Sequence, residues 1–367
     1  MANILDYIAW RGDLDFSEAP FCEVDNLVLS LLSYFDFSGL VPESPQKSVT
    51  LSQAAGQYFR LRPWTKNSLG VLFSDQYREL LEKAAGCRRF GSILPWGQVN
   101  RIDEELEMQF SATCFSLGSG ETFVAFRGTD DTIVGWKEDF NMTVLFPIPA
   151  QQQAALYLDR TSRETGDRLI LGGHSKGGNL AVYAAAFCSP QTRRRIDSIW
   201  SNDGPGFFPN MLTSPEYLAV RDRIRSVLPR SSIIGVFLDS DCETIPVESS
   251  TVGPLQHDGL SWQVLGPRFV RAAGLSKHSR QADRTLHMLV EEMALGQRKL
   301  LIDTLFSACD ELGIKTLTEL VSEKNKLHRL HTIYTKFSAF DKQTRDTFFR
   351  TLLATFRQNE ELIQDIQ

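Results

Sequence analysis

One stretch constrains the fold of this chain more than any other: LILGGHSKGGNLAVYAAAF, residues 169–187. A short apolar run leads directly into a glycine-rich turn, and an alanine-rich pattern typical of a helix follows at once. Ser175 lies at the centre of the turn, within Gly-His-Ser-Lys-Gly. Very small residues on both sides of a serine let a strand and the following helix approach each other closely. The stretch therefore predicts a sharp strand–turn–helix from which a serine side chain projects.

Ser175 is for this reason a candidate nucleophile. A serine hydroxyl attacks a carbonyl carbon only when a nearby base removes its proton, and a tight turn projects the hydroxyl clear of its own backbone. The helix that follows directs its first N–H groups, including that of Lys176, toward the negative charge that develops in such an attack. A phosphate-binding turn is the alternative, but the glycine spacing of a P-loop does not precede Lys176.

The segments around this turn indicate an α/β fold. QFSATCFSLGSGETFVAFRG at 109–128 predicts a β-hairpin, because two β-prone runs flank a Gly-Ser-Gly turn. RLILGG, IDSIWSND and SIIGVFLDS are further short apolar runs that predict strands. Helical patterns lie between them, including PEYLAVRDRIRS at 215–226. Strands that alternate with helices are typical of a mainly parallel sheet flanked by helices.

The same patterns divide the chain into three regions. Residues 1–100 are mostly helical in pattern and are expected to pack on the core. Residues 101–280 hold the alternating strands and helices. Residues 281–367 return to helical patterns, for example DTFFRTLLATFRQ at 346–358.

Composition and charge exclude several classes of function. The 367 residues are 42% hydrophobic and 23% charged, with a formal net charge of −6, as in many soluble globular proteins. The chain has no basic block with interleaved aromatic residues, so we expect no nucleic-acid partner, and the run Arg193–Arg195 is predicted to be a solvated helix end. No apolar run reaches transmembrane length, and the N-terminus lacks the basic start of a signal peptide. Scattered cysteines indicate neither a zinc site nor a disulfide framework, so we expect a cytoplasmic protein.

Three motifs carry a resemblance to a known family. FVAFRGTDD at 123–131, GWKEDF at 135–140 and GGHSKGGNLA at 172–181 resemble the class 3, fungal-type lipases of the α/β-hydrolase superfamily. The resemblance is closer to a bacterial branch of lipase-like proteins known as a domain of unknown function, which also has counterparts of SNDGPGF and LQHDGLSWQV. It implies an α/β-hydrolase fold with helical additions at both ends.

The resemblance also implies an oxyanion site. Arg127-Gly128-Thr129 matches the oxyanion-loop motif of class 3 lipases, in which Thr129 would supply a backbone N–H and its hydroxyl. Lys176 would supply the second N–H. Arg127 would order the loop through an acid such as Asp139.

The general base is expected late in the chain, because the triad order in this fold is serine, acid, histidine. His257, in VGPLQHDGLSW, follows the last apolar strand and matches the family position. His174 is adjacent to the nucleophile inside the turn and is interpreted as packing. The other histidines lie in polar, helical stretches and are interpreted as surface residues: His278, His287, His328 and His331.

The triad acid stays open between several carboxylates. FLDSDCETIP follows the strand expected before His257, and the resemblance to an Asp shortly before an apolar-Pro pair favours Asp241. Asp203 ends the previous strand and is a direct competitor. Three further acids complete the set: Asp239 and Glu243 as later alternatives, and Asp258 as a solvated neighbour of His257.

The segment 131–153 lies where class 3 lipases carry a lid, and it is either a lid over an acyl pocket or a helix docked on the sheet. We expect a serine hydrolase that cleaves a carboxylic ester, with a small acyl ester or lipid as substrate and with neither a metal nor an organic cofactor. A phospholipase, a hydrolase of thioesters or amides, and a catalytically silent binding protein are the alternatives. The sequence does not indicate an oligomeric state.

Overall fold

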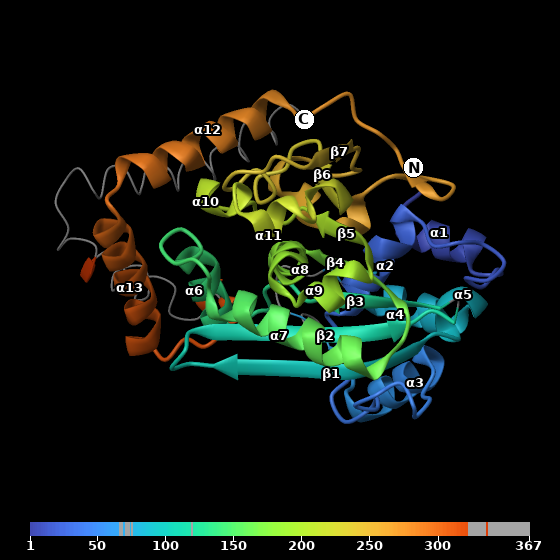
Figure 1. Cartoon of the computed structure of the whole chain (residues 1–367). Coiled ribbons are helices and arrows are strands. Elements are labelled where there is room, and N and C mark those ends of the chain that lie inside the picture. The colour runs from blue at the N-terminus through green and yellow to red at the C-terminus, as the bar shows by residue number, and fades with distance from the viewer. Residues whose placement is uncertain (66–68, 70–73, 75, 119, 322–334, 337–367) are drawn as a thin grey trace, which may run out of the picture.

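The computed structural model contains a seven-stranded sheet in its described part, which comprises residues 1–65, 69, 74, 76–118, 120–321 and 335–336. The strand order is β1-β2-β3-β4-β5-β6-β7 (Figure 1). β1, β2 and β3 are antiparallel neighbours, and β3 to β7 are parallel. The strands are β1 Leu94–Asp103, β2 Met108–Ser116, β3 Glu121–Phe126, β4 Arg168–His174, β5 Ile196–Asn202, β6 Ile224–Pro229 and β7 Glu243–Val247.

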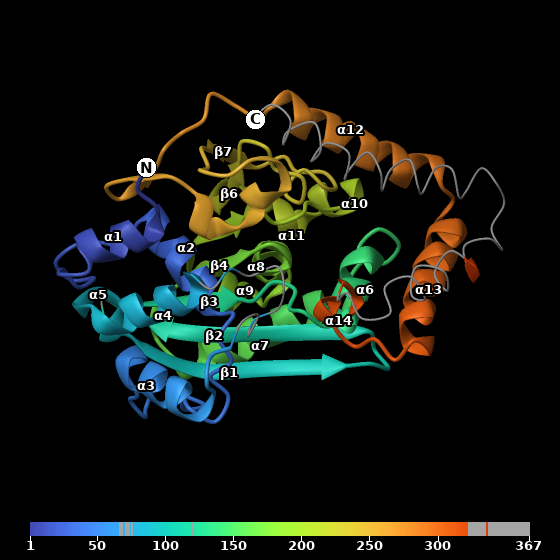
Figure 2. The ribbon, with the colours of Figure 1, turned by 180° about the vertical axis from the view of Figure 1, so that it is seen from behind.

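Helices cover both faces of this sheet (Figure 2). The N-terminal helices are α1 Ile4–Arg11, α2 Glu23–Leu32, α3 Leu51–Leu61, α4 Gln76–Gly86 and α5 Arg88–Gly91. The helices within the core region are α6 Ile133–Asn141, α7 Pro149–Glu164, α8 Lys176–Phe187, α9 Pro190–Arg194, α10 Pro209–Leu212 and α11 Pro215–Leu218. The mainly parallel sheet with flanking helices confirms the predicted α/β-hydrolase fold class.

The sheet separates two hydrophobic cores, because successive strand residues point to opposite faces. Along β3, Phe123 and Ala125 contribute to the core that contains α1 and α2. Val124 and Phe126 contribute to the core that contains α7 and α8. The predicted hairpin at 109–128 is present as β2 and β3, which pair from Ala112–Phe126 to Ser116–Thr122.

Two of the predicted elements are wrong. SIIGVFLDS at 232–240 is a loop of turns and bends, and not a strand. β6 instead begins at Ile224, inside the stretch predicted as a helix over 215–226. The loop is held by a contact that is distant in sequence: the N–H of Gly235 donates to Oδ1 of Asp203 at 3.1 Å, and a Cβ on Gly235 would lie only 2.5 Å from that oxygen. The apolar run therefore wraps around an acid instead of extending the sheet.

The arginine run at 193–195 was predicted as a solvated helix end, and this is correct only for exposed Arg194. Arg193 donates to the carbonyls of Ala186 at 2.6 Å and Cys188 at 3.2 Å, at the end of α8. Arg195 donates to the carbonyls of Ser162 and Thr165, at the end of α7. The last carbonyls of a helix have no partner inside the helix, so these guanidinium groups satisfy them.

The helices after residue 276 are α12 Lys277–Glu292, α13 Leu295–Glu311 and α14 Leu317–Val321. α13 lies beside α6 in both views (Figures 1 and 2), and Phe306 of α13 packs on Phe140 of α6 with ring centroids 5.7 Å apart. The predicted helix at 346–358 lies outside the described residues. Among the residues that the structure describes, no helix combines the length and the apolar character needed to cross a membrane.

Candidate active site

Ser175 lies in the turn between β4 and α8, with φ at 59° and ψ at −134°. A positive φ is sterically unfavourable for a residue with a side chain, so the turn holds this serine in a strained conformation. Gly173 and Gly177 permit it: a Cβ on Gly173 would lie 2.3 Å from the backbone of Gly177 across the turn, and a Cβ on Gly177 would lie 2.1 Å from the carbonyl oxygen of Phe126 at the end of β3. The predicted strand–turn–helix is therefore present, with a half-buried serine at its apex.

His257 is paired with Asp203 at the carboxyl end of the sheet. The Nδ1 atom of His257 lies 2.6 Å from Oδ2 of Asp203. Asp203 follows β5 directly, is fully buried, and has a φ of 50°. Its other oxygen accepts hydrogen bonds from the hydroxyl of Ser232 at 2.5 Å and the N–H of Gly235 at 3.1 Å. These donors stabilise the charged form of a carboxylate that has no contact with solvent.

Asp241, the acid favoured from the sequence, is not brought to His257. Its Oδ1 accepts a hydrogen bond from the hydroxyl of Tyr217 at 2.6 Å. The physical reason is its position before β7: residues that precede a parallel strand lie at the opposite edge of the sheet from residues that follow one. Asp203 follows β5, the direct neighbour of β4, and this places it beside the turn of Ser175.

The remaining candidate acids also lie away from the Nδ1 atom of His257. Asp239 exchanges two backbone hydrogen bonds with Phe207, at 2.8 and 3.1 Å. Glu243 begins β7 and pairs with Arg225 at 3.1 Å. Asp258 was interpreted as solvated, but its Oδ1 accepts from the N–H of Leu260 at 3.0 Å, and burial raises its pKa.

His174 does more than pack against its neighbours. Its Nε2 lies 2.7 Å from the backbone oxygen of His257, and the two rings have centroids 4.6 Å apart. Its Nδ1 lies 3.1 Å from the hydroxyl of Tyr34. Burial is the main reason why the pKa of His174 falls to about 3, so this imidazole is neutral at physiological pH. Sequence reasoning missed these contacts.

The other predicted surface histidines lie far along the chain from the turn. His278 is exposed, and His287 is half-buried with its Nε2 3.1 Å from a carboxylate oxygen of Asp283. His328 and His331 lie outside the described residues.

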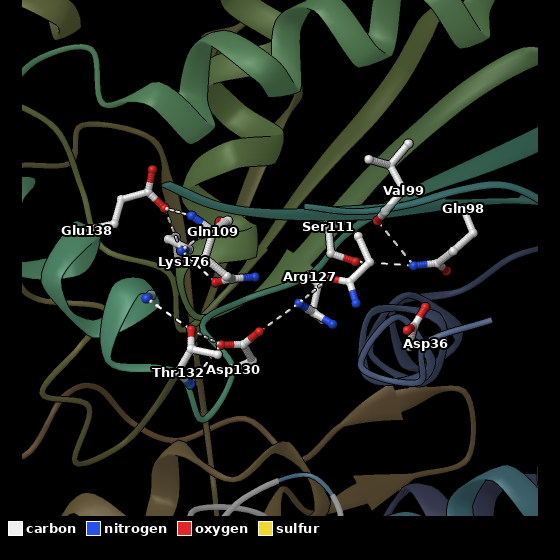
Figure 3. A network of polar contacts seen from close by, with 12 residues as sticks. Asp36, Gln98, Val99, Gln109, Ser111, Arg127, Asp130, Thr132, Glu138 and Lys176 are labelled. Carbon is white, nitrogen blue, oxygen red and sulfur yellow. Dashed lines mark hydrogen bonds and ion pairs between the residues drawn. The ribbon is translucent and has the colours of Figure 1, made fainter. Parts of the chain in front are cut away.

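Thr129 lies in the loop after β3, next to Gly128. A Cβ on Gly128 would lie 3.2 Å from the Cβ of Ser175, so the loop and the turn of Ser175 are in close contact. The hydroxyl of Thr129 donates to Oδ2 of Asp139 at 2.5 Å. Arg127 was expected to pair with Asp139, but it contacts Asp130 at 2.9 Å instead (Figure 3).

Lys176 begins α8, and its side chain is buried beneath the turn. The Nζ atom donates to Oε2 of Glu138 at 2.9 Å and to the carbonyl and side-chain oxygens of Gln109 at 3.1 and 2.8 Å (Figure 3). The side chains of Lys176 and Glu138 are 1% and 0% exposed. The carboxylate of Glu138 also accepts the N–H groups of Gln109 at 3.0 Å and Ala150 at 2.9 Å.

Glu138 belongs to α6, so this network fixes the segment predicted as either a lid or a docked helix. α6 is attached on its other side as well: Ile133 donates its N–H to the carbonyl of Lys315 at 2.9 Å, and Leu317 donates to that of Asp131 at 2.8 Å. A helix held by a buried ion pair and by α13 is docked in this structure. With α6 in this position, 30% of the His257 side chain is exposed.

No group of three or more metal-ligating side chains occurs in the part of the chain that the structure describes. The candidate site contains a strained serine, a histidine paired with a buried carboxylate, and the loop of Thr129 close to the serine turn. Such a set can move a proton away from a hydroxyl and stabilise a developing oxyanion.

The sheet topology, the strained serine turn and the His257–Asp203 pair define the chain as an α/β-hydrolase-fold protein, and the lipase-like resemblance is confirmed as to fold. The chain belongs to the Mbeg1-like family, whose model matches residues 85–307. No curated protein matches the sequence.

Several solved lipase structures are similar to this chain. A Rhizomucor miehei lipase–propeptide complex is 11% identical with a TM-score of 0.30, over 42% of this chain and 57% of that one. M37 lipase is 15% identical with a TM-score of 0.36, over 58% of this chain and 69% of that one. A lipase from Rhizopus microsporus var. chinensis is 14% identical with a TM-score of 0.29, over 69% and 83%. Likeness at this level assigns no activity to the present chain.

Proposed function

We propose that the protein is a serine hydrolase that cleaves a carboxylic ester, as lipases and esterases do, through an acyl-enzyme on Ser175. The observation that carries this proposal is the 2.6 Å contact between His257 and buried Asp203, beside a serine held at a φ of 59°. A carboxylate on Nδ1 keeps the proton there and leaves Nε2 of the imidazole free to accept another.

In the proposed reaction, Oγ of Ser175 bonds to the ester carbon while its proton moves to Nε2 of His257. The backbone N–H groups of Lys176 and Thr129 stabilise the oxyanion. The same proton then passes to the departing alcohol as the ester C–O bond breaks. A water molecule, activated by His257, hydrolyses the acyl-enzyme and releases the acid. These steps need neither a metal nor an organic cofactor.

Three observations favour a dissolved ester of short or medium acyl length. α6 is held by the buried Lys176–Glu138 pair, and His257 is partly exposed with α6 in place. Val252 and Leu255 lie shortly before His257 and are 39% and 67% exposed, so they offer apolar contacts to an acyl chain near the site. The net charge of −6 disfavours an anionic bilayer as substrate.

The test is covalent labelling with a fluorophosphonate, read by intact mass. The wild type and Ser52→Ala, a control at an exposed serine of α3, should each gain one phosphonyl group, and Ser175→Ala should gain none. The labelled preparations are then assayed on p-nitrophenyl esters of increasing chain length. Labelling of Ser175→Ala would contradict the nucleophile. A wild type that neither labels nor hydrolyses any ester would favour the silent binding protein, and turnover of phospholipid alone would favour a phospholipase.

A further inference from the structure

A row of polar side chains crosses the buried face of the N-terminal helices. Asn26, Ser30 and Tyr34 are spaced four residues apart, along α2 and the turn that follows it. Side chains at this spacing share one face of a helix. Asn26 and Ser30 are fully buried and Tyr34 is 4% exposed, whereas the residues between them are mostly leucine and valine. We refer to Asn26, Ser30 and Tyr34 as the α2 polar row.

Buried polar groups cost free energy unless they are hydrogen-bonded, so the partners of this row explain its presence. Asn26 and Asn202 exchange two amide hydrogen bonds, at 2.8 and 3.0 Å. The amide of Asn202 also lies 3.3 Å from the hydroxyl of Ser30. Two members of the row therefore contact one residue, which directly precedes Asp203.

Asn202 connects the row to both strands of the candidate site. Its side-chain nitrogen donates to the carbonyl of Gly173 at 3.1 Å, and its own carbonyl accepts the N–H of Ser175 at 2.9 Å. The amide of Asn202 thus bridges the end of β5, which leads into Asp203, to the end of β4, which leads into Ser175.

Tyr34, the third member, reaches His257 through His174. The backbone oxygen of His257 can only accept a hydrogen bond, so Nε2 of His174 must carry the proton at their 2.7 Å contact. In a neutral imidazole the other nitrogen is then an acceptor, and the hydroxyl of Tyr34 donates to it at 3.1 Å. Tyr34 therefore fixes both the tautomer and the direction of the ring that holds the backbone of His257.

We propose that the α2 polar row positions the candidate triad: Asn26 and Ser30 hold Asp203 and Ser175 through Asn202, and Tyr34 holds His257 through His174. The row lies outside residues 85–307, so the part of the chain that the family model matches does not contain it. The proposal rests on the proposed function for its kinetic consequence. It makes Asn26, Ser30 and Tyr34 positioning residues that do not touch substrate.

The kinetic test compares Tyr34→Phe with Tyr58→Phe. Each variant removes one hydroxyl from a buried tyrosine of the N-terminal part, but Tyr58 packs on Phe35 and Phe37 and not on the site. Misplacement of catalytic groups by about 1 Å can cost on the order of 100-fold in rate. Tyr34→Phe should lower kcat and the fluorophosphonate labelling rate about 10-fold or more with KM unchanged, while Tyr58→Phe labels as the wild type. Equal labelling rates for the two variants, at equal fractions folded, would overturn the proposal.

Asn26→Ala and Ser33→Ala form a second pair for the case that Tyr34→Phe does not fold. Ser33 is buried in the same turn, and its hydroxyl donates to the carbonyl of Ser30 at 2.7 Å without contacting the site. Asn26→Ala should slow labelling and Ser33→Ala should not. Equal rates here would contradict the role of Asn202 as the link.

Imidazole ¹⁵N spectra test the positioning without any turnover. In the wild type, His174 should carry its proton on Nε2 and remain neutral from about pH 5 to 8. Tyr34→Phe should shift the signals of both His174 and His257, and Tyr58→Phe should shift neither. Unmoved His257 signals in Tyr34→Phe would contradict the proposal. If Tyr34→Phe shows these shifts but the wild type is never labelled by the fluorophosphonate, the proposed function is contradicted instead.

Discussion

The two ends of the parallel strands use charge in different ways. At the carboxyl end, Asp203, Lys176 and Glu138 are almost completely buried, and each is hydrogen-bonded. At the amino end, the side chains of Arg168 and Asp241 are 65% and 41% exposed, and their ion pairs lie at the surface. Exposed pairs contribute little to stability, whereas buried charges are strongly destabilising when one partner is lost. The comparison shows that residue type alone does not reveal which acids are buried in the candidate site.

The largest expected effect is a loss of kcat, and it should distinguish Asp203 from Asp241, the two candidates for the triad acid. Asp203→Asn leaves His257 without a carboxylate on Nδ1, so kcat on a p-nitrophenyl ester should fall by about 10⁴-fold. Asp241→Asn removes an exposed ion pair with Arg221, keeps an oxygen that accepts from the Tyr217 hydroxyl, and should leave kcat unchanged. Measured kcat values for the two purified variants decide the matter. A similar loss of kcat in both variants, or a greater loss in Asp241→Asn, would contradict the assignment of the triad acid to the carboxyl end of the strands.

The next effect concerns the residues at the two ends of β4. Lys176→Met leaves Glu138 buried without a positive partner, and the free energy of unfolding should fall by about 3–5 kcal/mol. Arg168→Met breaks an exposed pair with Glu121 and should cost about 1 kcal/mol or less. Urea unfolding followed by circular dichroism measures both. Replacing Glu138 by glutamine in the Lys176→Met protein removes the buried charge and keeps an oxygen acceptor for a backbone N–H, so it should recover part of the loss. No recovery would show that the unpaired charge is not responsible.

The smallest effect is the pH dependence associated with Asp139. Burial is the main reason why its pKa rises from 3.8 to about 6. A carboxyl group whose pKa is higher in the folded chain binds its proton more tightly when folded, so its stabilising contribution is present at low pH and is lost as the pH rises from 3.8 to about 6. The loss amounts to about 3 kcal/mol. Urea unfolding midpoints measured across this pH range should fall in the wild type and not in Asp139→Asn. If the midpoints of the two proteins change in parallel with pH, the role of Asp139 is contradicted.

Sequence reasoning located the turn of Ser175 because its signal is local: small residues, a strand before it and a helix after it. The acid depended on which strands are neighbours, and this is not local. The pattern SIIGVFLDS predicts a strand, and Asp239 and Asp241 would lie at the carboxyl end of that strand. The structure has no strand there. The real strand is β6, and the loop after it closes on Asp203 through Ser232 and Gly235.

The partners of His174 were missed for a related reason. His174 lies in a turn, where the sequence has no helical or strand periodicity from which its contacts could be predicted. Its partner Tyr34 is 140 residues away along the chain. One signal was present: polar residues every four positions in an otherwise apolar helix indicate a buried polar contact. The pattern does not identify the partner, because Asn202 and His174 are reached only after the sheet has formed.

The position of α2 has a consequence for dividing this chain into parts. A fragment cut to residues 85–307 would keep the strands but lose the helix that covers one side of them. Phe123, Ile170 and Val227, which belong to the core formed with α2, would then face water. The fragment would also end before Ile314 and Leu317, which complete the attachment of α6. We therefore expect that the segment matched by the family model does not fold by itself, and that a piece for expression or crystallisation has to begin upstream of α2.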